Sequence, residues 1–212
     1  MDVPVNIGVG PAVFGFGNPS FTLDGLQSPI VEDQPWHYGL RLRLAARIDY
    51  EFVKQNPRVV PKQYRDRFTK DTVVYYRPME LIFIPRELMI SPGGDSQIYG
   101  ATWSFIGGGI PMTAGNARLT LGADLLLTYA YIGSDVYASP THFLRPGISI
   151  GPELRVDFTR RFAMSLGWDS SFYIPQQIGG GVFSMGGDAP NLWHIGQGYL
   201  QFHFIVPYST SL

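Results

Sequence analysis

A stretch near the start of the chain, WHYGLRLRLAARIDYEF at 36–52, alternates between two kinds of side chain. From Tyr38 onward every second residue is apolar or aromatic, and the residues between them are charged, polar or small. A period of two is typical of a β-strand. The run exceeds the roughly 5–6 residues usual in soluble strands. It suits a tilted strand that crosses a bilayer, which needs about 9–11 residues.

The ends of this apolar face are aromatic. Tyr38 and Tyr50 stand at its two ends, with Phe52 beyond, as expected for aromatic girdles at two membrane interfaces. A long strand of a soluble sandwich or lipocalin-like barrel is the alternative, with the apolar face as its core. Small residues and charges that share the other face favour the membrane interpretation.

The composition agrees with a chain that has one apolar and one polar face. Charged residues make up 16% of the 212 residues, compared with about 25% in soluble domains. No stretch approaches the roughly 20 apolar residues of a membrane helix. The net charge of −1 gives no case for nucleic-acid binding, and the absence of cysteine excludes disulfides. We expect residues 1–212 to form a single domain.

Seven further segments show strand character, which makes eight strands, an even number as in bacterial single-chain barrels. The third is the poorest, because Pro78 and Glu80 interrupt it. The predicted fold is all-β, an eight-stranded antiparallel up-and-down transmembrane barrel. Loops are predicted at 17–35, 85–96, 133–142 and 175–192 on one side, and short turns at 108–115 and 159–160 on the other. The predicted strands are 3–16, 36–52, 73–84, 97–107, 116–132, 143–158, 161–174 and 193–208.

This pattern resembles the small eight-stranded bacterial outer-membrane barrels of the OmpA, OmpX and OmpW type. The resemblance covers nearly the whole chain, through its alternating strands, interface aromatics and closing strand LQFHFIVPY at 200–208. That strand is similar to the C-terminal assembly signal of such barrels, which usually ends on a terminal aromatic, whereas Ser209 to Leu212 follow Tyr208 here. No motif identifies one family within the class.

The resemblance implies a place in the bacterial outer membrane, in contact with its lipid and lipopolysaccharide. Asp2 follows Met1 directly and no signal peptide is present, so we expect a mature chain with an added initiator methionine. Such barrels serve as structural anchors, small pores, adhesion proteins or lipid-modifying enzymes, so the resemblance leaves the function open.

Charged residues recur on the predicted inward faces of the strands. Charges in a narrow interior must pair or incur a large desolvation cost, so we expect a network that closes the lumen. A gated path for small solutes is the alternative. The predicted lumen charge network consists of Arg41, Arg43, Arg47, Asp49, Glu51, Arg118, Asp124, Arg145, Glu153, Arg155, Asp157 and Asp169.

The connection at 53–72 is basic and falls on the side of the short turns. Pro61 could start a short helix that runs to Phe68, because proline is tolerated in the first helical turn. A solvated loop is the simplest interpretation. The functional hypothesis is a contact with lipid phosphates or another anionic partner through Lys62, Arg65 and Arg67.

An enzyme hypothesis would pair His142 with Glu153, as in a lipid A deacylase that combines histidine, serine and an acidic group. The two positions differ by an odd number, so a single strand would place them on opposite faces unless His142 lies in the loop. No serine is clearly placed to complete the set. His37 and His203 have no neighbours at metal-ligand spacing. We therefore predict no catalytic site, cofactor or metal.

The predicted function is a structural or interaction role in the outer membrane, with a lumen closed by charges. Envelope or surface proteins are further candidate partners. A small-solute pore is the first alternative, a lipid-modifying enzyme is a second, and a soluble barrel with an apolar lumen is a third.

Overall fold

A computed structural model describes residues 2–16, 36–58, 61–66, 73–76, 83–91, 96–134, 140–177 and 191–209. Most of these residues lie in strands, and the two helices are short. The strands are β1 (Asp2–Phe16), β2 (His37–Asp49), β3 (Val73–Tyr76), β4 (Glu87–Ser91), β5 (Ser96–Ala114), β6 (Ala117–Ser134), β7 (Thr141–Asp157), β8 (Phe162–Gln177) and β9 (Asn191–Ser209). The helices are α1 (Tyr50–Gln55) and α2 (Lys62–Arg65).

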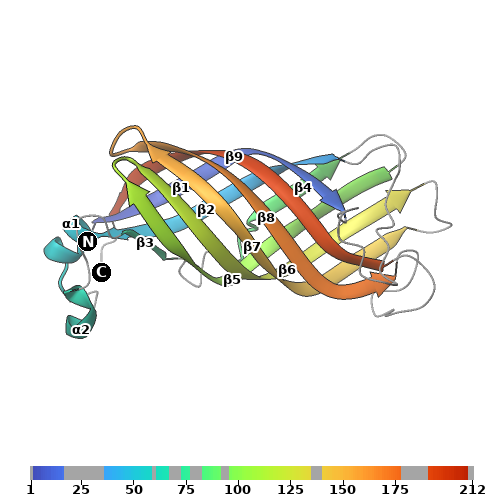
Figure 1. Ribbon diagram of the computed structural model, residues 1–212, viewed down its shortest axis with the longest axis horizontal. Helices are drawn as coiled ribbons and strands as arrows, with labels where there is room; N and C mark the ends of the chain where they lie inside the picture. The colour runs from blue at the N-terminus through green and yellow to red at the C-terminus, as the bar shows by residue number, and fades with distance from the viewer. Residues whose placement is uncertain are drawn as a thin grey trace.

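The strands form one closed antiparallel barrel. Strand β1 pairs with β2 on one edge and with β9 on the other, so the sheet closes on itself. Both β3 and β4 pair with β2, at different heights, and together they occupy one of eight positions around the barrel. The predicted eight-stranded up-and-down barrel is confirmed. Figure 1 shows both termini at one end, which we call the terminal mouth; we call the opposite end the loop mouth.

The outer wall is apolar and the inner wall is polar or small. Large side chains on the predicted outward face stand exposed, among them Leu121, Leu125 and Ile148, whereas inward Asn6 and Thr128 are completely buried. An exposed apolar wall around a closed sheet is the architecture of a transmembrane barrel, which leaves no strand edge to the lipid at closure. The predicted assignment of inner and outer faces is therefore confirmed for these strands.

No helix among the described residues is long and apolar enough to span a membrane.

Strand β2 ends three residues earlier than predicted. The Asp49 side chain accepts a hydrogen bond from the Phe52 amide at 2.9 Å and caps helix α1. The prediction that Glu51 faces the lumen from a strand is therefore wrong: Glu51 lies in the first turn of α1 and is exposed. Phe52, predicted to stand in a membrane girdle, is instead buried in α1.

The third position of the barrel differs most from the prediction. The segment predicted as a loop at 85–96 contains strand β4; of the strand predicted at 73–84, the structure shows β3 at Val73–Tyr76, and residues 77–82 lie outside the described residues. Ala46 pairs with Tyr76, and Arg41 pairs with Glu87. The two β2 residues are five positions apart in the sequence, whereas their partners are eleven positions apart. This position thus holds six more residues than the strand it faces. Pro78 and Pro85, which lack amide donors, lie within the interruption.

The turn predicted at 108–115 is mostly strand. Strand β5 continues to Ala114, and Ile110 and Met112 pair with outward residues Leu121 and Leu119 of β6. The chain reverses only at 115–116, where Gly115 has a positive φ of 61°, a conformation that glycine adopts without steric cost. Three consecutive glycines at 107–109 therefore belong to the barrel wall.

The remaining predicted boundaries agree within a few residues. The predicted turn at 159–160 connects β7 with β8. The predicted loop at 17–35 lies outside the described residues, as do the central parts of the loops predicted at 133–142 and 175–192.

We predict that Leu125→Arg destabilises the barrel and that Gly122→Ser does not. Leu125 is 50% exposed on the lipid side, where an arginine near the midplane costs roughly 2–4 kcal/mol. A Cβ atom at lumen-facing Gly122 would meet its nearest neighbour, the Gly108 carbonyl oxygen, at an ordinary 3.6 Å. Urea unfolding in lipid vesicles measures both free energies. If Gly122→Ser abolished folding and Leu125→Arg did not, the assigned faces would be reversed.

Candidate functional site

The middle of the lumen contains a cluster of ion pairs centred on Arg41 of β2. Its guanidinium pairs with Glu87 of β4 and, at 2.6 Å, with Asp169 of β8. It also donates to Gln197 at 2.9 Å and lies 4.2 Å from the ring centroid of Tyr199. Arg41 is almost completely buried, so these contacts replace the hydration that its charge would have in water.

Arg86 extends this cluster to the other side of the barrel. It pairs with Glu87 at 2.8 Å and with Asp124 of β6 at 2.9 Å, and donates to Ser149 of β7 at 3.1 Å. Asp124 also accepts from Ser104 at 3.1 Å. The sequence analysis missed Arg86 and Glu87, because both lie in the segment predicted as a loop. A basic residue next to an acidic one before the apolar run LMI was the available signal.

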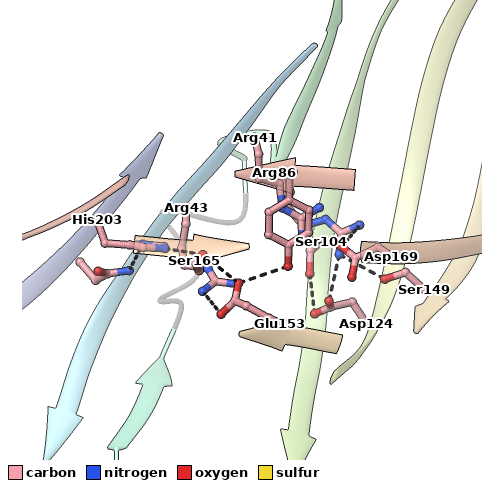
Figure 2. Close-up of polar contacts among 12 residues, drawn as sticks. Arg41, Arg43, Arg86, Ser104, Asp124, Ser149, Glu153, Ser165, Asp169 and His203 are labelled. Atoms are coloured by element: carbon pink, nitrogen blue, oxygen red, sulfur yellow. Dashed lines mark hydrogen bonds and ion pairs between the residues drawn. The ribbon is translucent and has the colours of Figure 1, made fainter. Parts of the chain in front are cut away.

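A second ion pair joins opposite walls of the barrel (Figure 2). Arg43 of β2 contacts Glu153 of β7 at 2.7 Å, and these strands are four positions apart around the eight-membered ring. Ser165 and Tyr199 also donate to the Glu153 carboxylate, at 3.5 and 3.2 Å. This ion pair therefore spans the full diameter of the barrel at its level.

The other predicted network residues lie closer to the terminal mouth or make different contacts. Arg47 pairs with Asp49 at 3.2 Å and Arg155 pairs with Asp157 at 3.0 Å, each within its own strand. Arg118 faces inward on β6 and is half-buried. The buried Arg145 donates to the Leu144 carbonyl at 3.1 Å. Of the twelve predicted residues, Glu51 is the one that lies outside the sheet.

The loop-side half of the lumen contains a cluster of apolar side chains, which the sequence analysis did not anticipate. Phe143 and Tyr173 pack edge to face with ring centroids 5.2 Å apart, and Ile98 and Phe143 are completely buried. Tyr173 lies over the inward glycine Gly147, where a Cβ would come within 2.5 Å of its ring. The cluster consists of Phe14, Met89, Ile98, Leu126, Ala130, Ile132, Phe143, Tyr173, Leu192 and Ile195.

A serine and a histidine meet inside the barrel. Ser165 Oγ lies 2.8 Å from His203 Nε2, and Asn6 contacts the other ring nitrogen of His203 at 3.4 Å. This distance is within reach for a nucleophile and its base. Ser165 is only 1% exposed and His203 is completely buried, so a substrate has no access to the serine in this structure. Ser165, His203 and Asn6 therefore belong to the polar lining of the lumen around Glu153.

The other histidines occupy unrelated positions. His142 lies on the outside of β7 and contacts the Tyr129 hydroxyl at 3.0 Å, whereas Glu153 faces the lumen, so the predicted separation of these two residues is confirmed. His37 is buried near the loop mouth, 3.2 Å from Ser91 Oγ.

The basic connection begins as helix rather than as a loop. Its first residues belong to α1, and its centre forms α2, which carries exposed Lys62 and half-buried Arg65. The helix predicted from Pro61 to Phe68 is shorter than expected and ends at Arg65. Arg67 lies outside the described residues.

No protein-family model matches the sequence, and no curated protein matches it. Among solved structures, the chain is similar to neisserial surface protein A (NspA), with a TM-score of 0.49 and 10% identity, covering 95% of this chain and 97% of that chain. It is also similar to Ail, the attachment invasion locus protein of Yersinia pestis, with a TM-score of 0.38 and 8% identity. That match covers 97% of this chain and 100% of the Ail chain, which is in complex with the heparin analogue sucrose octasulfate.

We predict a strong energetic coupling between Arg43 and Glu153. Glu153→Leu leaves the half-buried Arg43 guanidinium without its carboxylate and should lower the free energy of unfolding by about 2 kcal/mol. The double variant Arg43→Met, Glu153→Leu removes both charges and should recover most of that loss. Urea unfolding of the wild type, both single variants and the double variant measures the coupling energy. Additive effects of the two single changes would show that the pair does not join the walls.

Proposed function

We propose that this protein is a closed, non-conducting barrel of the bacterial outer membrane, whose role is that of a structural anchor or interaction scaffold. This proposal rests on one observation: two barriers follow each other along the lumen. The apolar cluster lies in the loop-side half, and the ion pairs of Arg41, Arg43 and Arg86 cross the middle.

The two barriers oppose solute passage for different physical reasons. An ion entering the apolar cluster would lose its hydration without gaining partners, which is strongly unfavourable. A solute in the middle layer would have to separate buried ion pairs, which leaves uncompensated charges. A pore therefore requires two independent rearrangements of the interior. Partners in this proposal include lipid and lipopolysaccharide around the wall, and envelope or surface proteins at the mouths.

We predict that the purified protein gives no single-channel steps in planar lipid bilayers. The variant Arg43→Ala, Glu153→Ala should also be silent, because the apolar cluster around Phe143 remains intact. A slower or faster gel migration after boiling verifies that each sample was folded, since a closed barrel keeps its hydrogen bonds in detergent. A known porin inserted under the same conditions serves as the positive control. Regular conductance steps from the wild-type protein would overturn the closed barrel in favour of the pore.

The second part of the proposal concerns the basic connection at the terminal mouth. Lys54, Arg58 and Lys62 are exposed on or beside α1 and α2, which extend beyond the barrel wall (Figure 1). Clustered basic side chains contribute about 1 kcal/mol each near an anionic surface, within a Debye length of about 8 Å. A barrel needs only two or three residues to connect neighbouring strands. We infer that the additional length presents these charges to an anionic partner such as lipid phosphate.

Replacing Lys62, Arg65 and Arg67 by glutamine should weaken salt-sensitive binding to anionic surfaces. The protein in nanodiscs is cosedimented with phosphatidylglycerol vesicles at low and high salt, and Gln63→Ala, an exposed change on the same helix, is the matched control. Binding that is unchanged at low salt would eliminate the electrostatic contact. A loss of barrel stability in the triple variant would instead assign the connection a packing role.

A further inference from the structure

A polar cavity of about 660 Å³ opens at the terminal mouth. Charged, polar and apolar residues line it together: Pro4 of β1, Arg47 and Asp49 of β2, Tyr50, Glu51 and Gln55 of α1, Arg160 of the β7–β8 turn and Ile205 of β9. Figure 1 shows α1 beside the N-terminus at this mouth. We call this cavity the vestibule. It is separated from the loop side by both barriers, and its volume is typical of sites for small ligands.

The helical wall of the vestibule is firmly attached to the barrel. A helix of six residues is not stable alone in water. Here α1 is capped by Asp49 at one end, Asn56 bonds the Phe52 carbonyl at the other, and Phe52 and Val53 are buried. These contacts hold the backbone of α1 at the vestibule, where Glu51 and Gln55 belong to the lining.

The vestibule presents one charge of each sign to an occupant. Arg47 and Asp49 neutralise each other at 3.2 Å, and Asp49 is also engaged as the cap of α1. Glu51 and Arg160 are both exposed, come from different elements, and take part in none of the ion pairs found among the described residues. The vestibule thus offers one carboxylate and one guanidinium, with no net charge.

We propose that the vestibule binds short zwitterionic peptides. A ligand with both an ammonium and a carboxylate complements Glu51 and Arg160 together, whereas a purely anionic or cationic ligand would pair with only one of them. The Gln55 amide can donate to and accept from a peptide bond, and Ile205 offers an apolar surface for small side chains. This inference does not depend on whether the lumen conducts.

The experiment compares three probes of nearly equal size. The dipeptide L-alanyl-L-alanine carries both charges, its N-acetyl derivative lacks the ammonium, and its C-terminal amide lacks the carboxylate. Backbone amide shifts of the full-length protein in detergent micelles give the dissociation constants. Removing either charge from the dipeptide should weaken binding about tenfold, the loss of a charge-assisted hydrogen bond.

Variants assign each charge to its partner. Glu51→Gln should remove the preference for the dipeptide over its N-acetyl derivative and retain the preference over the amide. Arg160→Gln should do the reverse. Arg161→Gln, on the same turn but outside the vestibule lining, is the matched control and should leave both preferences unchanged. Equal affinities for the three probes, or no shifts at the vestibule residues, would overturn the proposal. Each variant is first shown to be folded by its heat-dependent gel migration.

Discussion

The interior of this barrel depends on one electrostatic constraint: a charge removed from water inside a narrow sheet must find a compensating partner within the lumen. Arg43 reaches Glu153 across the full ring, and Arg41 reaches Asp169 over nearly as many strands. Such pairs connect walls that have no hydrogen-bonded ladder between them. They therefore hold the cross-section together, in addition to the neighbour-to-neighbour ladder of the sheet.

The irregular third position of the barrel supplies the cation that completes this constraint. The six additional residues between β3 and β4 interrupt the ladder with β2, and the chain re-enters the sheet at Arg86, whose amide donates to the Thr102 carbonyl at 2.7 Å. At this point the Arg86 guanidinium can reach Glu87, Asp124 and Asp169. The segment directly after the poorest strand pattern in the sequence thus supplies a cation that, like Arg41, contacts several partners in the lumen.

Strand positions and side-chain orientations that depend on alternation can be predicted from the sequence. The prediction fails where another structural rule overrides the alternation. Alternation identified seven of the eight barrel positions and separated Leu125 from Gly122 correctly. It failed at Glu51, because capping by Asp49 changes the backbone from strand to helix while the alternation continues. It also failed at Gly107 to Ala114, where glycine-rich composition indicates a turn but the small residues belong to a strand.

The candidate site was predictable only in part for a related reason. Inward charges such as Arg41 and Asp169 stand out in the alternating pattern, but their partners are set by the stagger between strands, which a single sequence does not reveal. Alternation places Phe143 and Ile132 on the inward faces of their strands, but a single sequence does not show that inward apolar side chains from several strands meet in one cluster. The Ser165–His203 contact likewise joins residues 38 positions apart.

The division of the lumen into layers restricts where the protein can meet other molecules. In the closed barrel that we propose, apolar packing on the loop side and ion pairs in the middle leave the vestibule and the two mouths as the lumen regions open to polar ligands. At the terminal mouth, Asp49 neutralises Arg47 and caps α1 with the same carboxylate. One residue therefore ends the barrel strand, starts the helix and leaves Glu51 directed to solvent. This change of backbone direction places Glu51 of α1 and Arg160 of the β7–β8 turn in the lining of the same cavity. The ligand binding that we propose at the terminal mouth depends on this placement.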